Sequence, residues 1–214
     1  MTRPTPQQLE RLMEFGAATV HEACAKNGAM DSALKPLDPS FRFAGVALTV
    51  DAMPRDNLVL HHALTIARPG DVLVVDAKGY TEAGPWGDVM TLAAQITGLA
   101  ALVIDGSVRD SASIVAMNFP VFSRGVCIKG TTKNQPGRVN VPVVCGGVAV
   151  NPGDIVIGDR DGLVVLPPGD AAEAIRLSEA RLQKEGEYRE LLRKGQNSVQ
   201  YLDLTPALSR VGLL

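Results

Sequence analysis

The sequence has little of three features that mark specialised proteins: cysteine, aromatic residues and charge of one sign. Its three cysteines lie far apart among 214 residues, which excludes a disulfide framework and a paired zinc-ligand spacing. The formal net charge is −2, so the chain offers no strongly basic field for a nucleic acid backbone. We therefore expect a protein of the reducing cytoplasm with no nucleic acid partner.

Long hydrophobic runs are also missing. No apolar run reaches the roughly 20 residues of a membrane-spanning helix, and Met1 to Gln8 lacks the apolar block of a signal peptide, so no membrane partner is expected. The composition is 46% hydrophobic but only 4% aromatic, with 21 glycines and 14 prolines. Such a chain builds its core from small aliphatic residues on many short elements, and its length suits one domain, 1–214.

The order of apolar segments predicts an α/β fold. Helices are expected at 5–27, 57–67, 89–98 and 111–117, and strands at 41–53, 72–76, 101–105 and 120–123. A glycine- and proline-rich loop, 79–86, precedes the helix at 89–98, so this helix and its flanking strands form a βαβ unit. Ligands of open α/β sheets bind at the carboxyl edge of such strands, which is where the loop and the helix start are expected.

The last third of the chain has a different pattern. Short strands are expected at 139–144, 148–150, 154–158 and 162–166, separated by turns rich in glycine and aspartate, and they predict a second sheet layer. A charged helix is expected from Ala171 to Lys194, with Gly195 ending it.

The segment Asp105-Gly-Ser-Val-Arg-Asp110 is the most informative, because it places Arg109 and Asp110 directly after a buried strand. A guanidinium can hold a carboxylate with two parallel hydrogen bonds, and a neighbouring carboxylate can bind a hard cation. This pair therefore suits a 2-oxo acid. An Arg–Asp pair that caps the helix at Ser111 is an equally good interpretation of the spacing.

Gly87 and Asp88 lie 22 residues upstream of that pair, at the expected start of the helix 89–98. Free amide groups at a helix start favour an anion, and the missing Cβ of Gly87 lets one approach closely. The alternative is that Asp88 is an ordinary N-cap.

Other reactive side chains form no pattern of their own. Structural roles are expected for His21, His61, His62, Cys127, Cys145, Asp159 and Asp161. Lys129 and Lys133 would form a Schiff base only if desolvated, and solvated loop charges are the simpler interpretation.

Taken together, these segments resemble the family of class II 4-hydroxy-4-methyl-2-oxoglutarate/4-carboxy-4-hydroxy-2-oxoadipate aldolases, which also contains the regulators of ribonuclease E activity. Beside the Asp105 to Asp110 segment, matching stretches run through nearly the whole chain at 19–23, 28–31, 43–50, 56–61, 69–76, 86–88, 120–125, 139–143 and 151–154. The resemblance implies a layered, swivelling β/β/α fold and a homotrimer or homohexamer with sites between subunits. It also implies that 171–195 forms a helix reaching a neighbouring subunit.

The resemblance further implies roles for the residues at the helix start. Arg109 is expected to hold a pyruvyl carboxylate, and the substrate-binding residues beside it are Gly87, Asp88, Val89 and Met90, the last two through their backbone amides.

A divalent cation, Mg²⁺ or Mn²⁺, is the implied cofactor. Asp110 is expected to bind it directly, and Asp88 through water. Glu185 of a neighbouring subunit is the expected third acidic residue, with Glu187 as its alternative.

The implied activity is retro-aldol cleavage of a 4-hydroxy-2-oxo di- or tricarboxylate to pyruvate and a second 2-oxo acid, with oxaloacetate decarboxylation by the same enolate chemistry. The alternative is a non-catalytic, protein-binding regulator of ribonuclease E activity, which would not need the acidic residues. The segment Gly125 to Gly130 departs from the family's usual Ser-Pro-Arg-Gly-like stretch, and this bears on the distal end of the substrate.

Overall fold

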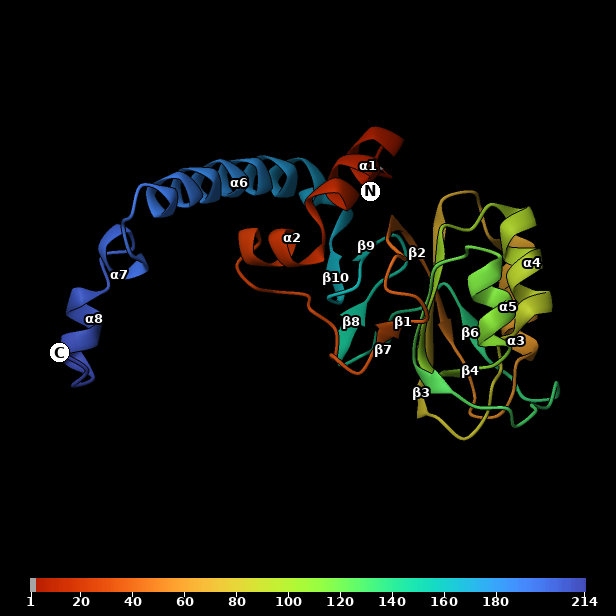
Figure 1. Ribbon diagram of the computed structural model, residues 1–214. Coiled ribbons are helices and arrows are strands. Elements are labelled where there is room, and N and C mark those ends of the chain that lie inside the picture. The colour runs from red at the N-terminus through yellow and green to blue at the C-terminus, as the bar shows by residue number, and fades with distance from the viewer. Residues whose placement is uncertain (1–2) are drawn as a thin grey trace.

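The computed structural model describes residues 3–214 and is built around one large sheet (Figure 1). The strand order is β1-β5-β4-β3-β2-β9-β10, and β6 pairs with the carboxyl end of β2. These strands are β1 (Lys35–Pro36), β2 (Phe43–Asp51), β3 (Asp71–Tyr80), β4 (Ala101–Val108), β5 (Val121–Val126), β6 (Arg138–Val139), β9 (Ile155–Gly158) and β10 (Leu163–Leu166). The neighbours β5, β4, β3 and β2 run parallel, which confirms the expected mixed α/β fold.

The sheet is the middle of three layers. Alternate residues of β3 face opposite sides, so Leu73 and Val75 pack with the helices while Val72 and Val74 pack with a small hairpin. The helices on the first side are α3 (Leu58–Ile66), α4 (Asp88–Thr97) and α5 (Ser111–Ala116), which lie together in Figure 1. The hairpin consists of β7 (Val143–Cys145) and β8 (Val148–Val150).

The expected helical segment 5–27 is two helices, α1 (Pro6–Phe15) and α2 (Ala17–Ala23). Thr5 begins the first one with a capping box shared with Gln8. Gly16 separates the two helices because its φ of 80° lies in the left-handed region that interrupts an α-helix. Both helices pack over β9 and β10 beside the start of α6.

The expected second sheet layer after residue 139 is only partly correct. β9 pairs with β2 and β10 with β9, so both strands extend the main sheet, and β6 joins it as well. Only the hairpin β7–β8 stands apart as a second layer. The sequence pattern identifies short strands but not their partners, and the open edge of β2 offered backbone groups that β9 satisfies.

Two central strands are longer than expected, since β3 continues past Asp76 and β4 past Asp105. Each aspartate is paired within the sheet layer instead of ending a strand. The Asp105 carboxylate forms an ion pair with Arg124 and accepts the Gly146 N–H at 2.8 Å. Asp76 accepts a hydrogen bond from Lys78 Nζ at 2.6 Å. Satisfied in this way, a polar residue is compatible with a buried strand.

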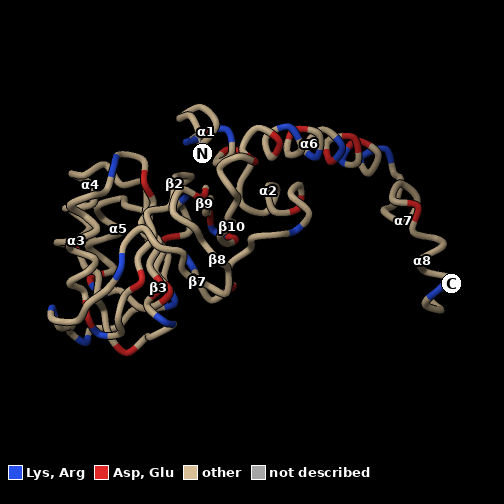
Figure 2. The backbone as a smooth tube through the Cα atoms, turned by 180° about the vertical axis from the view of Figure 1, so that it is seen from behind, with Lys and Arg blue, Asp and Glu red and all other residues tan. Residues whose placement is uncertain are grey.

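The carboxyl-terminal segment forms an arm that leaves the body of the molecule (Figure 1). It consists of the 3-10 turn η1 (Pro168–Asp170) and the helices α6 (Ala171–Arg193), α7 (Ser198–Tyr201) and α8 (Thr205–Arg210). Only the start of α6 is anchored, through buried Ala171, Ala174 and Ser178. Charges of both signs follow along α6 (Figure 2). Within 3–214, no helix is both long and apolar enough to cross a membrane.

Candidate active site

Two adjacent strands, β3 and β4, bring the candidate residues to one edge of the sheet. The loop after β3 leads to Gly87 and Asp88, and Arg109 and Asp110 follow β4 directly. The backbone N–H of Arg109 donates to the carbonyl oxygen of Trp86 at 2.8 Å, which fastens the end of β4 to the start of α4. The sequence prediction that these four residues meet at the carboxyl edge agrees with this geometry.

The Asp110 side chain turns toward α4 rather than toward its own helix. Asp110 has a φ of 56° at the N-cap position of α5, yet within the described chain its carboxylate makes no capping hydrogen bond there. Its Oδ2 instead accepts the Asp88 N–H at 3.3 Å and lies 3.5 Å from Arg109 Nε. The capping interpretation of the Arg–Asp pair is therefore not supported. A non-glycine residue in the left-handed region is a local strain that this arrangement tolerates.

Gly87 makes this approach of the two segments possible. An ideal Cβ on Gly87 would lie 2.3 Å from Asp110 Oδ2 and 3.2 Å from Arg109 Nε. Its φ of −146° is open to any residue, so the need for glycine comes from contact with the two side chains and not from backbone conformation.

Gly87→Ala is expected to lower the activity that the sequence resemblance implies by at least roughly tenfold, because the added methyl displaces Asp110 and Arg109 from their present positions. Activity on a 2-oxo acid and the thermal midpoint should be measured together. Gly125→Ala is the matched control, since its Cβ would meet only Ser107 Oγ at 3.6 Å. Equal activity in the two variants would contradict the proposed packing constraint.

The start of α4 differs in detail from the expectation. Gly87 occupies the N-cap position and Asp88 is the first helical residue. The Asp88 Oδ1 accepts the Val89 N–H at 2.7 Å, so Asp88 does act as a local cap in this conformation. A carboxylate ligand would reach the Val89 amide only after the Asp88 side chain rotates away.

A buried tryptophan holds the loop before α4. Trp86 is fully buried, and its Nε1 donates to Thr91 Oγ1 at 2.8 Å. The Thr91 hydroxyl in turn donates to the Gly87 carbonyl oxygen at 3.0 Å. This chain of hydrogen bonds fixes the backbone at the helix start, where anion-binding amides need a rigid support.

Sequence reasoning assigned no role to Asn57, which supports the same loop. Asn57 Nδ2 donates to the Pro85 carbonyl oxygen at 2.9 Å, and the residue is buried. Beside it, burial opposes ionisation of Asp56, but hydrogen bonds from Asn134 N–H and Thr132 Oγ1 lower its pKa to about 2. The pair lies within the stretch 56–61 that carries the family resemblance, and this was the available signal.

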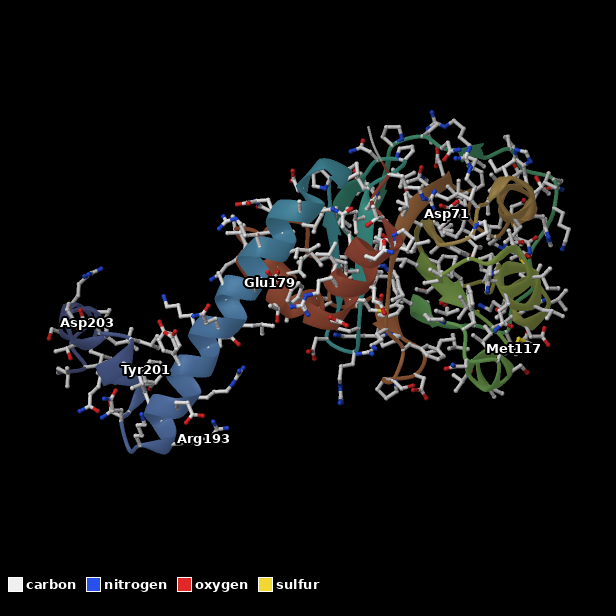
Figure 3. The ribbon with its side chains drawn as sticks, turned by 90° about the horizontal axis from the view of Figure 1, so that it is seen from above. Asp71, Met117, Glu179, Arg193, Tyr201 and Asp203 are labelled. Carbon is white, nitrogen blue, oxygen red and sulfur yellow. The ribbon has the colours of Figure 1, made fainter. Side chains whose placement is uncertain are left out.

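Glu185 is not part of this cluster within one chain. It lies on α6 between Glu179 and Arg193, which Figure 3 places along the arm and away from the helices that flank the sheet. Its carboxylate forms ion pairs with Arg181 at 3.0 Å and Arg189 at 2.9 Å. Any contact with Asp88 therefore requires a second subunit.

The acidic donors fit a hard cation only in part. Among residues 3–214, no three His, Cys, Asp or Glu side chains are grouped as a metal site. Asp88 and Asp110 supply two carboxylates from segments in contact, since Asp110 Oδ2 lies 3.3 Å from the Asp88 backbone nitrogen, and Mg²⁺ commonly binds one or two carboxylates and keeps several waters. The two carboxylates match that chemistry, with further donors left to water, substrate or a second subunit.

Three other reactive residues, His21, Cys145 and Lys129, have contacts that do not suggest a role in catalysis. His21 Nδ1 lies 3.1 Å from the carbonyl oxygen of Asn27. Cys145 is buried, and burial raises the pKa of its thiol, which disfavours a nucleophilic thiolate. Lys129 is paired with Glu82, and this hydrogen bond raises its pKa. A protonated amine is a poor Schiff-base former, and the Lys129 side chain is 63% exposed, which agrees with the solvated loop charge that the sequence favoured.

Comparison with known proteins identifies first the fold and then the family. A solved structure of an uncharacterized protein from Pseudomonas syringae pv. tomato is 28% identical, with a TM-score of 0.82 over 93% of this chain and 94% of that one. The RNA-processing inhibitor RraA from Thermus thermophilis is 28% identical, with a TM-score of 0.65 over 70% of this chain and 91% of that one. These two likenesses show that the chain shares its layered α/β fold with solved structures, one of which is an RraA protein.

The family described as RraA-like, Aldolase/RraA, matches residues 17–165. This chain belongs to that family. A relative from Halalkalibacterium halodurans, named "Putative 4-hydroxy-4-methyl-2-oxoglutarate aldolase", is 39% identical over 75% of this chain and 76% of its own length. The resemblance inferred from the sequence segments is thus confirmed at the level of the family.

Proposed function

We propose that this chain is a cytoplasmic, divalent-metal-dependent (class II) pyruvate aldolase. Its substrate is 4-hydroxy-4-methyl-2-oxoglutarate or 4-carboxy-4-hydroxy-2-oxoadipate, which it cleaves to pyruvate and a second 2-oxo acid. One observation carries the proposal: Asp88 N–H and Arg109 Nε both approach Asp110 Oδ2, at 3.3 and 3.5 Å, at the start of α4. The name of the Halalkalibacterium relative supports the reaction class.

Arg109 binds the C1 carboxylate of the substrate. Its side chain is 45% exposed, and its backbone is fixed by Trp86, so the guanidinium is accessible on a rigid support. Two parallel hydrogen bonds from the guanidinium orient the carboxylate. The backbone amides of Val89 and Met90 add donors at the positive end of the helix dipole.

Asp88 changes its partner when substrate binds. Once the substrate carboxylate takes the Val89 amide, the Asp88 carboxylate is released from its 2.7 Å local hydrogen bond. We assign it, together with the partner subunit's Glu185, to a water that accepts the C4 hydroxyl proton. The C3–C4 bond then breaks, C4 becomes a carbonyl, and the electron pair passes to the pyruvyl fragment, which takes up a proton at C3. Arg109 stabilises the developing negative charge.

Asp110 would hold the divalent cation directly, and Asp88 through water. When bound, the cation supplies a Lewis acid for the negative charge that develops on the pyruvyl oxygen. Mg²⁺ or Mn²⁺ suits these donors, because both are carboxylates and, among residues 3–214, no set of histidine and cysteine ligands is grouped with them.

A homotrimer or homohexamer completes the proposal. Glu185 lies on α6 and Asp88 begins α4, and Figure 1 shows α6 leading away from α4, so a closed oligomer is needed to bring a Glu185 to a site.

Metal removal tests the proposed function. Excess EDTA is expected to lower pyruvate release from 4-hydroxy-4-methyl-2-oxoglutarate by at least roughly 100-fold, because the Lewis acid supplies several kcal/mol to the barrier. Added Mg²⁺ or Mn²⁺ should restore the rate, and oxaloacetate decarboxylation should fall and recover in parallel. Unchanged turnover in EDTA would contradict the metal's role. A borohydride-trapped adduct on Lys129 or Lys133 would instead indicate a Schiff base.

Regulation of a ribonuclease is the second candidate, favoured by the similarity to the Thermus inhibitor RraA. It predicts binding to ribonuclease E and no release of pyruvate from any 2-oxo acid. Measuring both properties on the same preparation distinguishes the two functions.

A further inference from the structure

The turn after β5 begins beside Arg109. β4 and β5 are parallel with Val108 opposite Val126, and the Cys127 N–H donates to the Val108 carbonyl oxygen at 2.8 Å. Arg109 is the residue that directly follows Val108 at the end of β4. Residues 127–130 therefore start at the same sheet edge as the proposed pyruvyl site.

A second loop meets this turn from the other side of β4. The Gly84 N–H, in the loop after β3, donates to the Lys129 carbonyl oxygen at 2.9 Å. The Glu82 carboxylate of the same loop forms an ion pair with Lys129 Nζ. Because β4 lies between β3 and β5, these contacts join the loops on either side of Arg109.

The joined loops pack on the stem of Arg109. An ideal Cβ on Gly84 would lie 2.4 Å from the Cys127 carbonyl oxygen and 2.9 Å from Arg109 Cβ. The absence of a side chain at Gly84 thus lets the turn carrying Lys129 approach Arg109 closely. Lys129 is held at the rim of the site by its backbone, independently of where its side chain points.

The Lys129 side chain is free to exchange partners. It is 63% exposed and Glu82 is 62% exposed, and an ion pair between two exposed side chains contributes little to stability. The hydrogen bond from Lys129 to Glu82 keeps the amine charged by raising its pKa. A carboxylate from a ligand can replace Glu82 at small cost.

We propose that Lys129 binds the distal carboxylate of the substrate and so favours 2-oxo acids that carry a carboxylate beyond C4. This rests on the proposed aldolase function. In such a substrate the C1 carboxylate takes Arg109, and the other end needs a second cation at the same edge. The turn after β5 supplies it.

The test compares Lys129→Met with the wild-type enzyme in two reactions. For cleavage of 4-carboxy-4-hydroxy-2-oxoadipate, the variant's KM is expected to rise about tenfold, because the substrate loses one charge-assisted hydrogen bond to the enzyme. For exchange of the pyruvate C3 protons with D₂O, which involves only the pyruvyl half, the rate should stay within about twofold. Lys133→Met, a nearby exposed lysine, is the matched control and should leave both unchanged.

The variant Glu82→Gln distinguishes two roles of Lys129: binding of the substrate, and holding the two loops together through its ion pair with Glu82. If Lys129 recognises substrate, removing its competitor leaves KM at or below the wild-type value. A rise in KM like that of Lys129→Met would mean that the ion pair only holds the loops together, and would overturn the proposal. An unchanged KM in Lys129→Met would overturn it too, with the aldolase function intact. A wild-type enzyme that neither cleaves nor exchanges would refute the proposed function itself.

Discussion

Arg109→Lys is expected to lower kcat/KM for pyruvate release by about 10²–10³-fold while the protein remains folded. Lysine keeps the positive charge but replaces a planar two-point donor with a single ammonium group. The loss of an oriented donor beside developing charge has an effect of this order. The Arg109 side chain is 45% exposed, so the thermal midpoint should change little. Steady-state kinetics and a thermal melt on the same sample measure both.

Arg138→Lys is the matched control for this substitution. Arg138 is an exposed arginine on β6, and its Nε and Nη2 donate to Asp51, at the carboxyl end of β2, at 3.0 and 2.6 Å. Because that ion pair has no proposed role in substrate binding, kcat/KM should stay within about twofold. If Arg109→Lys also kept more than half of the wild-type value, Arg109 would not be the carboxylate-binding residue.

The grouping of Gly87, Asp88, Arg109 and Asp110 could be predicted because it follows from local order along the chain. A strand, loop, helix and strand in succession place the loop and the next strand end at one edge. What the spacing left open was which way each carboxylate points. That depends on contacts between segments, such as the approach of Asp110 to the helix start across Gly87.

The parts that could not be predicted are those set by non-local pairing. The pattern of β9 and β10 identified them as strands but did not place them in the main sheet beside β2, since a short apolar strand can pair with any open sheet edge. The Glu82–Lys129 pair joins residues 47 positions apart, and two exposed charges in separate loops carry no periodic signal. Asn57 was missed for a similar reason, because its partner Pro85 lies in a distant loop.

Partial recovery of activity is expected when two variants that are inactive alone assemble into one oligomer. Arg109→Ala and Glu185→Ala should each retain roughly 1% of wild-type activity or less, because each removes one half of the proposed site. Co-expressed at equal levels, they should regain about a quarter of it, since random assembly pairs an intact Arg109 with an intact Glu185 from the adjacent subunit at one site in four. Activity per subunit of the purified mixed oligomer is the measurement.

Arg109→Ala co-expressed with Asp110→Ala is the decisive control, because both residues belong to one subunit's half of the site. Arg109 Nε lies 3.5 Å from Asp110 Oδ2 within the same chain, so no arrangement of these two variants restores an intact pair and activity should stay at the level of the single variants. The same experiment with Glu187→Ala in place of Glu185→Ala identifies which acid acts. If activity is restored neither with Glu185→Ala nor with Glu187→Ala as the partner of Arg109→Ala, a site shared between subunits is contradicted. The exposed arm that carries both glutamates would then have no part in the site. If activity is restored with only one of the two glutamate variants, that glutamate is the third acidic residue of the site, which reaches Asp88 from a neighbouring subunit.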